Sequence, residues 1–172
     1  MTVVIRAARL PDAAWLATLA ERTFRETYGA HNTPENMEHY VAEHFGSARQ
    51  AAELREGRMT TLVAEVDGEP AGYAQLGQRP APAGVTGGAP LEIVRFYVDR
   101  PWHGRGVAQQ LMEAAVNTAR AAGARTLWLG VWERNPRAIA FYRKCGFQDV
   151  GTQTFVLGAD HQRDLVLTRS VA

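Results

Sequence analysis

Apolar positions in the first third of the chain recur at the spacing of amphipathic helices. Pro11 and Asp12 open one predicted helix, which ends at Gly29 and whose inner face is formed by Trp15, Leu16, Leu19, Ala20, Thr23 and Phe24. Thr33 followed by Pro34 is a helix start, and it predicts a second helix that runs to Phe45. A strand before the first helix and a short helix after the second are predicted at Val3–Ile5 and Ser47–Leu54.

The middle of the chain alternates between strands and one long helix. The strands are predicted at Thr60–Val66, Ala71–Leu76, Leu91–Val98 and Thr126–Trp132, and the helix at Gly106–Ala122. Asp67-Gly68 is a hairpin turn signal between the first two strands. The segment Gln78–Pro90 is rich in proline and glycine and predicts a loop that we expect to be mobile. The almost wholly apolar Thr126–Trp132 is typical of a central strand covered on both faces.

The last part of the chain begins with a helix and finishes as short strands. Asn135-Pro136 opens this helix and Gly146 ends it, and the strands are predicted at Phe147–Val150, Phe155–Leu157 and Leu165–Thr168. The strand–helix–strand unit from Leu91 to Trp132 requires a right-handed parallel crossover, whereas the hairpin before it is antiparallel. The pattern therefore predicts a mixed α/β sheet in one domain that spans residues 1–172.

The composition narrows the classes of protein that the chain can belong to. Its 172 residues are 46% hydrophobic and 22% charged, which is the balance of a soluble globular protein. No apolar run approaches the roughly 20 residues of a membrane helix, and the first residues lack the pattern of a signal peptide. Cys145 is the one cysteine and cannot form an internal disulfide, so we expect a cytoplasmic location. The net charge of +1 gives no case for nucleic acid or a membrane as a partner.

The small net charge conceals an uneven distribution of charged residues. Between Glu26 and Glu56 there are six acidic residues and two basic ones, whereas between Arg95 and Lys144 there are nine basic and three acidic. The first stretch suits a cationic ligand and the second a polyanion. Two solvated surfaces would give the same pattern, so charge alone leaves the partners open.

The junction between the strand Leu91–Val98 and the helix that follows carries the clearest chemistry. A short loop containing Gly104 and Gly106 leads directly into the helix. Glycine lets the backbone approach a ligand closely, and the first amides of a helix lack internal partners. That combination binds pyrophosphate. A dinucleotide-binding fingerprint starting at Gly104 would need Gly or Ala where Gln109 stands, and the G-x-x-x-x-G-K-[ST] phosphate loop is absent.

This junction resembles the acetyl-CoA-binding motif of the GNAT superfamily of N-acetyltransferases. The motif is Gln or Arg, two residues, Gly, one residue, and then Gly or Ala, and it falls here on His103 through Ala108. His103 departs from the usual Gln or Arg, although it can still donate a hydrogen bond. A second match, Asn135 to Phe147, is similar to the family's N-x-x-A-x-x-F-Y-x-K-x-G-F helix. In that family the Asn contacts the cofactor arm and the Tyr hydroxyl lies near the thioester sulfur, which points to Asn135 and Tyr142 here.

The resemblance implies a single-domain α/β GNAT fold with acetyl-CoA as the co-substrate. We expect a mixed, mostly antiparallel central sheet with a parallel β-α-β acetyl-CoA-binding core, flanked by helices. Arg105 and Lys144 become candidates for the CoA phosphates. The residues that the resemblance places at the cofactor are Phe96, Tyr97, Val98, His103, Gly104, Arg105, Gly106, Val107, Ala108, Gln109, Asn135 and Lys144.

Further stretches are similar to a bacterial subgroup that includes polyamine (spermidine/spermine) N-acetyltransferases. They are Leu91–Ile93, Trp128–Asn135 and Phe155–Gly158 with Gln162 and Asp164, together with Thr23-Phe24, Tyr28-Gly29 and Thr33-Pro34 where the subgroup's acceptor-side helices begin. This likeness implies transfer of an acetyl group to a primary amine, with a polyamine or similar small cation as acceptor. A protein N-terminal or lysine acetyltransferase, and a non-catalytic acyl-CoA-binding regulatory module, stay as alternatives, and the oligomeric state, including a homodimer, is open.

The expected reaction assigns roles to a few side chains. An amine must lose a proton to attack a thioester, the tetrahedral intermediate needs a hydrogen-bond donor, and the leaving thiolate needs a proton. A strand amide near Val98 can supply the donor and Tyr142 the proton. Glu92 is our candidate for the base, although a surface carboxylate or a partner for the charge of the substrate is an equally good interpretation. Glu26 and Tyr28 are competitors for this role from the acceptor side. Trp132 is a candidate for the wall of the acceptor pocket, although a tryptophan on an apolar strand is more often part of the core.

The histidines and the cysteine predict no further chemistry. His39 and His44 are five residues apart and would diverge on a helix, and no other pair has a metal-ligand spacing, so we predict no metal. Cys145 lies beside Lys144, but no histidine is near it in the sequence, which favours a packed thiol at a helix end over a nucleophile.

Overall fold

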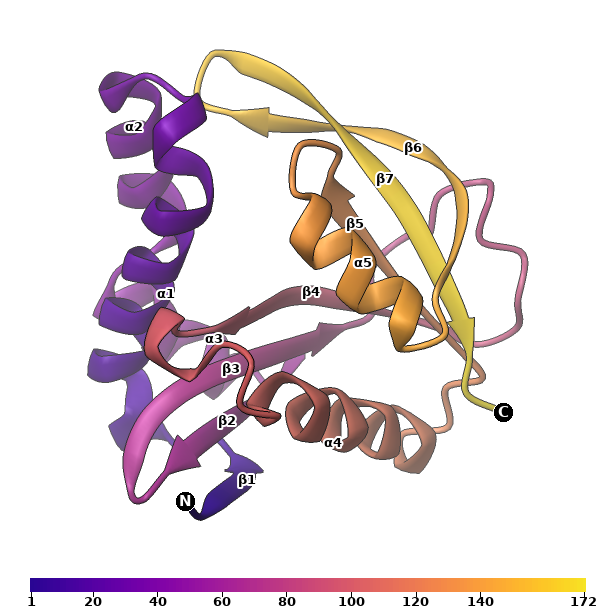
Figure 1. Cartoon of the computed structure of the whole chain (residues 1–172), viewed down its shortest axis with the longest axis horizontal. Helices are drawn as coiled ribbons and strands as arrows, with labels where there is room; N and C mark the ends of the chain where they lie inside the picture. Colours follow the sequence, from indigo (N-terminus) through magenta and orange to yellow (C-terminus); the bar gives the residue numbers. More distant parts are fainter.

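The computed structural model describes residues 1–172 and is built on one seven-stranded sheet with the strand order β1-β2-β3-β4-β5-β7-β6 (Figure 1). The strands are β1 (Val3–Ala7), β2 (Met59–Val66), β3 (Glu69–Gly77), β4 (Pro90–Val98), β5 (Thr126–Trp132), β6 (Gln148–Leu157) and β7 (Asp160–Ser170). The helices are α1 (Ala13–Tyr28), α2 (Pro34–His44), α3 (Ser47–Glu56), α4 (Val107–Ala121) and α5 (Pro136–Lys144). The single-domain mixed α/β fold expected from the sequence is confirmed.

All neighbouring strands are antiparallel except β4 and β5, and this exception shapes the molecule. The parallel pair is joined at only three positions, where Pro90–Glu92 of β4 faces Thr126–Trp128 of β5. A bulge in β4 opposite Gln75 and Leu76 leaves Val94 without a partner in β3. Bulges bend a strand and increase its twist. Beyond Glu92 the two strands therefore diverge, and the sheet opens at its centre.

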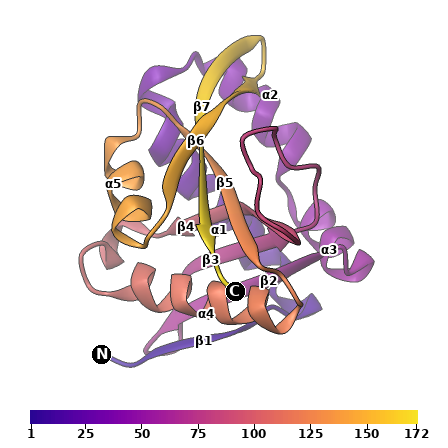
Figure 2. The same ribbon diagram turned by 90° about the vertical axis from the view of Figure 1, so that its right-hand side faces the viewer.

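Helices cover both faces of the sheet because each has one apolar side. The buried residues of α4 recur at helical spacing, at Val107, Leu111, Met112, Ala115, Val116 and Ala119. They pack with β5 and α5 in one core on the first face of the sheet. A second core on the opposite face joins α1 and α2 to Val63, Tyr73 and Leu157. Figure 2 shows α4 and α1 on opposite sides of the strands.

Most of the predicted elements are confirmed, and the boundaries given by capping residues agree best. Thr33 caps α2 by accepting a hydrogen bond from the Asn36 amide at 3.2 Å, and Asn135 caps α5 in the same way for Ala138. The segment after β3 is a loop as expected, and Gly84 and Gly87 pack tightly against Val150 and Thr126. No helix is long and apolar enough to cross a membrane.

The prediction for the end of the chain was wrong in one respect. The expected strands Phe147–Val150 and Phe155–Leu157 are one continuous strand, β6, and β7 begins at Asp160 rather than at Leu165. The polar run between the expected strands indicated a break. It lies instead on the outermost strand of the sheet, where six of the ten residues are exposed and polar residues cost little.

Candidate active site

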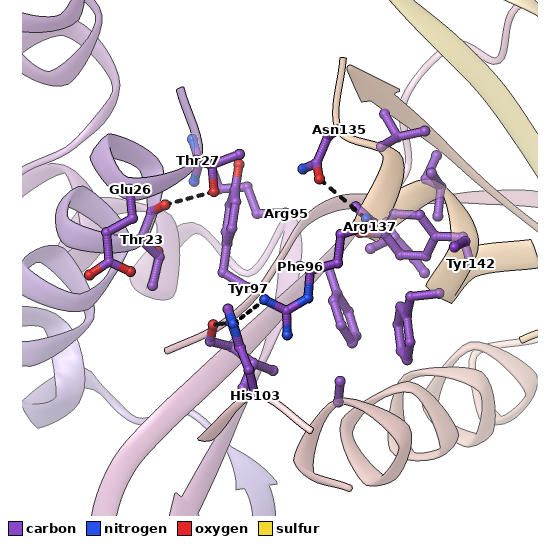
Figure 3. A pocket seen from close by; sticks show the side chains of 18 of the residues that line it. Thr23, Glu26, Thr27, Arg95, Phe96, Tyr97, His103, Asn135, Arg137 and Tyr142 are labelled. Carbon is purple, nitrogen blue, oxygen red and sulfur yellow. Dashed lines mark hydrogen bonds between the residues drawn. The ribbon is translucent and has the colours of Figure 1, made fainter. Parts of the chain in front are cut away.

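A cavity of about 730 Å³ opens where β4 and β5 diverge. Its lining comes from β4, the loop into α4, the first turn of α4, the middle of β5, α5 and the end of α1. Figure 3 shows α1 with Thr23, Glu26 and Thr27 on one side of this cavity, and Tyr142 on the other. One opening thus joins the first turn of α4 to the inner face of α1.

The loop before α4 forms a cradle for an anion. Gly104 and Gly106 have φ angles of 74° and 80°, which only glycine adopts without strain. Gly106 is the N-cap residue, and no side chain caps the helix. The first amides of this 15-residue helix therefore lack partners and lie at its positive end. Both glycines line the cavity, so this geometry fits a diphosphate.

His103 joins this loop to α5 across the cavity. Its Nε2 lies 2.6 Å from the Val98 carbonyl oxygen, and its Nδ1 lies 2.6 Å from Nη1 of Arg137 (Figure 3). A guanidinium can only donate hydrogen bonds, so Nδ1 accepts from Arg137 and Nε2 donates to Val98. This pair of contacts corresponds to the tautomer with its hydrogen on Nε2. This double role explains why a histidine can stand where the family motif has Gln or Arg.

The start and end of α5 place polar groups around the same cavity. The Asn135 side-chain oxygen accepts a hydrogen bond from the Ala138 amide at 3.2 Å, which leaves its NH₂ group as a free donor at the cavity. Tyr142 is 8% exposed and packs among Phe96, Phe141 and Phe147, and its hydroxyl has no hydrogen-bond partner in the chain. Burial raises the pKa of Tyr142, and the nearby Tyr97 raises it further. The hydroxyl thus stays protonated and free to donate.

The side of the cavity formed by α1 is aromatic with one exposed acid. Tyr28 and His31 line it, and both rings lie against the Trp132 ring. The ring centre of Tyr28 is 5.1 Å from that of Trp132, and the ring centre of His31 is 5.3 Å from it. Glu26 is exposed at the same wall. Burial raises the pKa of Tyr28 well above its usual value. Trp132, a candidate for the acceptor-pocket wall, is buried and does not line the cavity itself; it packs against these two rings.

The structure brings most of the predicted site residues together and leaves three outside the cavity lining. Phe96, Tyr97, Val98, His103, Gly104, Gly106, Ala108, Gln109, Asn135, Tyr142 and Lys144 all line the cavity. Arg105 lies over the Trp102 ring at 5.6 Å, and the Val107 side chain is fully buried in the core, so only its amide is available to a ligand. Glu92 faces Arg79, whose Nε lies 3.4 Å from its carboxylate. Burial raises the pKa of Glu92, and Arg79 opposes that effect.

Residues at variable positions of the second motif also belong to this region. Arg137 lines the cavity and holds His103, yet in the sequence it is one of many basic residues. Its place in the first turn of α5, directly after Pro136, was the available signal. Cys145 packs against the core, and burial raises the pKa of its thiol, which agrees with the packed cysteine predicted for it.

Comparison with known proteins shows the family of this chain. The model of the acetyltransferase (GNAT) family matches residues 16–147. An uncharacterized N-acetyltransferase of Mycobacterium tuberculosis is 37% identical over 163 residues, which are 94% of this chain and 99% of that protein. The chain belongs to the GNAT family of acetyltransferases. GNAT membership makes the protein an acyl-CoA-dependent N-acetyltransferase with acetyl-CoA as co-substrate.

Two more distant likenesses bear on the fold and the acceptor. The PaiA N-acetyltransferase of Thermoplasma acidophilum, solved in complex with coenzyme A, superimposes with a TM-score of 0.81 at 18% identity and covers 99% of each chain. A probable spermine N(1)-acetyltransferase of Bacillus subtilis subsp. natto is 26% identical over 90 residues, which are 52% of this chain and 59% of that protein. The GNAT fold is confirmed, and the polyamine likeness is limited to about half of each chain.

Proposed function

We propose that this GNAT protein transfers the acetyl group of acetyl-CoA to the primary amine of a small cation, with polyamines as the first candidates. The observation that carries the proposal is the single cavity with two unlike ends. One end has the unpaired amides of α4 with Arg137 and Lys144, and the other has Glu26 beside the rings of Tyr28 and His31. The acidic stretch Glu26–Glu56 and the partial likeness to a spermine acetyltransferase support a cationic acceptor.

The residues of the chain divide the chemistry between them. The amides at the start of α4 bind the diphosphate, and the free NH₂ group of Asn135 binds the cofactor arm, as the resemblance to the family implies. Tyr142 is the proton donor to the leaving thiolate, since its hydroxyl is protonated and has no partner in the chain. An amide of β4 near Val98 stabilises the oxygen of the tetrahedral intermediate. A carboxylate at the α1 wall attracts a cation in a partly desolvated cleft.

Release of CoA thiol with a panel of acceptors tests the proposal directly. The panel contains spermidine, spermine, simple monoamines and short basic peptides, each measured at two salt concentrations. We expect turnover with the small polycations, with KM values that rise with salt because exposed charges are screened. Preference for a peptide would identify a protein acetyltransferase, and CoA binding without any turnover would identify a regulatory module.

Two matched variants locate the cation. Glu26 and Glu35 are both exposed acids of the same acidic stretch, but only Glu26 lines the cavity. Glu26→Gln should raise KM for spermidine severalfold with little change in kcat, because the lost attraction acts on binding alone. Glu35→Gln should leave both constants unchanged. Equal effects of the two variants would show that the acidic surface acts only at long range.

A further inference from the structure

Asp164 of β7 is a buried acid that no role assigned so far uses. The residue is 7% exposed, and its Oδ1 atom is buried without a hydrogen-bond partner. The other buried acids each face a cation: Asp12 faces Arg6 at 2.7 Å, Asp99 faces Arg22 at 2.5 Å and Glu92 faces Arg79 at 3.4 Å. A buried, unpaired carboxylate is costly to the fold. Asp164 therefore stands apart as a group that structure alone does not account for.

A glycine in β5 brings this carboxylate to the cavity wall. Asp164 is paired with Trp132 in the register of β5 and β7, and Gly130 lies two residues before Trp132 on the same face of β5. A Cβ atom added to Gly130 would lie 3.0 Å from Asp164 Oδ2 and would also overlap the side-chain amide of Gln153 from β6. Gly130 lines the cavity. The missing side chain thus lets the Asp164 carboxylate and the Gln153 amide lie directly against Gly130, immediately behind this part of the cavity wall.

The surroundings of Asp164 raise its pKa toward neutrality, so that its carboxylate and its protonated form are both populated near pH 7. Burial raises the pKa of Asp164 to about 7, and the nearby negative charge of Glu133 adds to this effect. Three tyrosines that face it, Tyr28, Tyr40 and Tyr97, have their own pKa values raised in part by its charge. Glu133 pairs with Arg163 at 3.6 Å, and the His31 ring lies on Trp132, the register partner of Asp164. A base is most effective when its pKa lies near the working pH.

We propose that Asp164 accepts the proton from the attacking nitrogen of the acceptor amine at the Gly130 position of the cavity wall. The proposal rests on the amine acetylation proposed above. The neutral amine nitrogen forms its bond to the thioester carbonyl carbon and gives the tetrahedral intermediate, which collapses as the C–S bond breaks. The nitrogen loses one proton to the Asp164 carboxylate, and the sulfur gains one from the Tyr142 hydroxyl. Asp164 then releases its proton to solvent and Tyr142 regains one, so that the net reaction converts amine and thioester into amide and thiol.

The test is the pH dependence of amine acetylation in three variants. Asp164→Asn should lower kcat/KM roughly 10²-fold at neutral pH and should remove the rising limb centred near pH 7. Glu133→Gln should keep the limb but shift it to lower pH, because it removes the charge that helps to raise the pKa of Asp164. Asp160→Asn, an exposed acid on the same strand, should match the wild type.

Each outcome decides the assignment. A raised KM with unchanged kcat in Asp164→Asn would show that Asp164 only binds the ammonium group, and an unchanged limb would show a structural role; both overturn the proposal. Loss of the limb in Glu92→Gln instead would transfer the role to Glu92. Carbon-13 NMR titration of the aspartate side chains in the full chain measures the Asp164 pKa without turnover. A wild type that acetylates no amine would overturn the proposed function itself, which is visible before any variant is made.

Discussion

Replacement of Gly106 by alanine tests the anion cradle with the smallest possible change. The residue has a φ angle of 80°, and an added Cβ would meet only Gln109 Oε1, at 3.8 Å. An alanine there causes no clash within the protein, but it adopts a left-handed backbone at a cost of about 1–2 kcal/mol. For a chain of this length, that lowers the melting temperature by roughly 2–4 °C for each kcal/mol. Gly106 lines the cavity, so the added methyl group occupies open space beside the α4 amides that would bind the diphosphate.

The effect on CoA follows from the hydrogen bonds that the methyl group obstructs. A hydrogen bond to a charged group contributes about 1.5–3 kcal/mol. Loss of one such bond between an α4 amide and a phosphate weakens CoA binding by roughly 10- to 100-fold, at about 1.4 kcal/mol for each factor of ten. Isothermal titration calorimetry with CoA measures this change. Acetylpantetheine, which lacks the diphosphate, should bind the variant and the wild type alike.

A second glycine provides the matched control. Gly57 follows α3, has a φ angle of 64°, and has nothing within 4 Å of an added Cβ. Gly57→Ala therefore introduces similar backbone strain far from the cavity. Both variants should lose similar stability, and only Gly106→Ala should lose affinity for CoA. Equal CoA affinity in the two variants, with both folded, would refute the assignment of the cradle.

Three further predictions follow from the contacts described. Tyr142→Phe should lower kcat roughly 10²-fold in the thiol-release assay with little change in CoA affinity, and near wild-type turnover would show that another group protonates the thiolate. His103→Ala should weaken CoA binding severalfold by calorimetry because it frees Arg137, whereas His103→Gln, which can both donate and accept, should restore most of it. Arg6 holds the pKa of Asp12 well below its usual range, so Asp12→Asn should lower the free energy of unfolding in urea by about 2 kcal/mol at neutral pH. That difference should shrink as the pH falls below about 4, since the wild-type carboxylate then loses its advantage; a constant difference would contradict the ion pair.

Local signals account for the parts of the fold that could be predicted from the sequence. The starts of α4 and α5 agree with the prediction because Gly106 and Asn135-Pro136 begin a helix through residues adjacent to them in the chain. The divergence of β4 and β5 could not be predicted, because register and the bulge at Val94 arise between strands. The unbroken β6 was missed for a related reason: its polar residues are tolerated only because the strand lies at the edge of the sheet.

The same distinction separates the site residues that were found from those that were missed. The cradle and Tyr142 lie in contiguous motifs, so the residues near them in the sequence identify them. Asp164 acquires its position only through Gly130 on another strand, and Arg137 acquires its role only through His103 on another loop. Each of these contacts joins residues that are distant in the chain, and neither residue is unusual by type. Contacts between side chains that are distant in the sequence could therefore be found only from the structure.

The three-residue pairing of β4 with β5 has a consequence for how the molecule holds together. Apart from the shared core, β1–β4 and β5–β7 are joined by few backbone hydrogen bonds, so they form two blocks of one sheet. A ligand in the cavity contacts both blocks, so its binding free energy stabilises them together and makes their unfolding more cooperative. CoA should therefore slow amide hydrogen exchange throughout β5–β7, including positions that it never contacts. The co-substrate would therefore stabilise the junction between the two blocks of the sheet as well as supply the acetyl group.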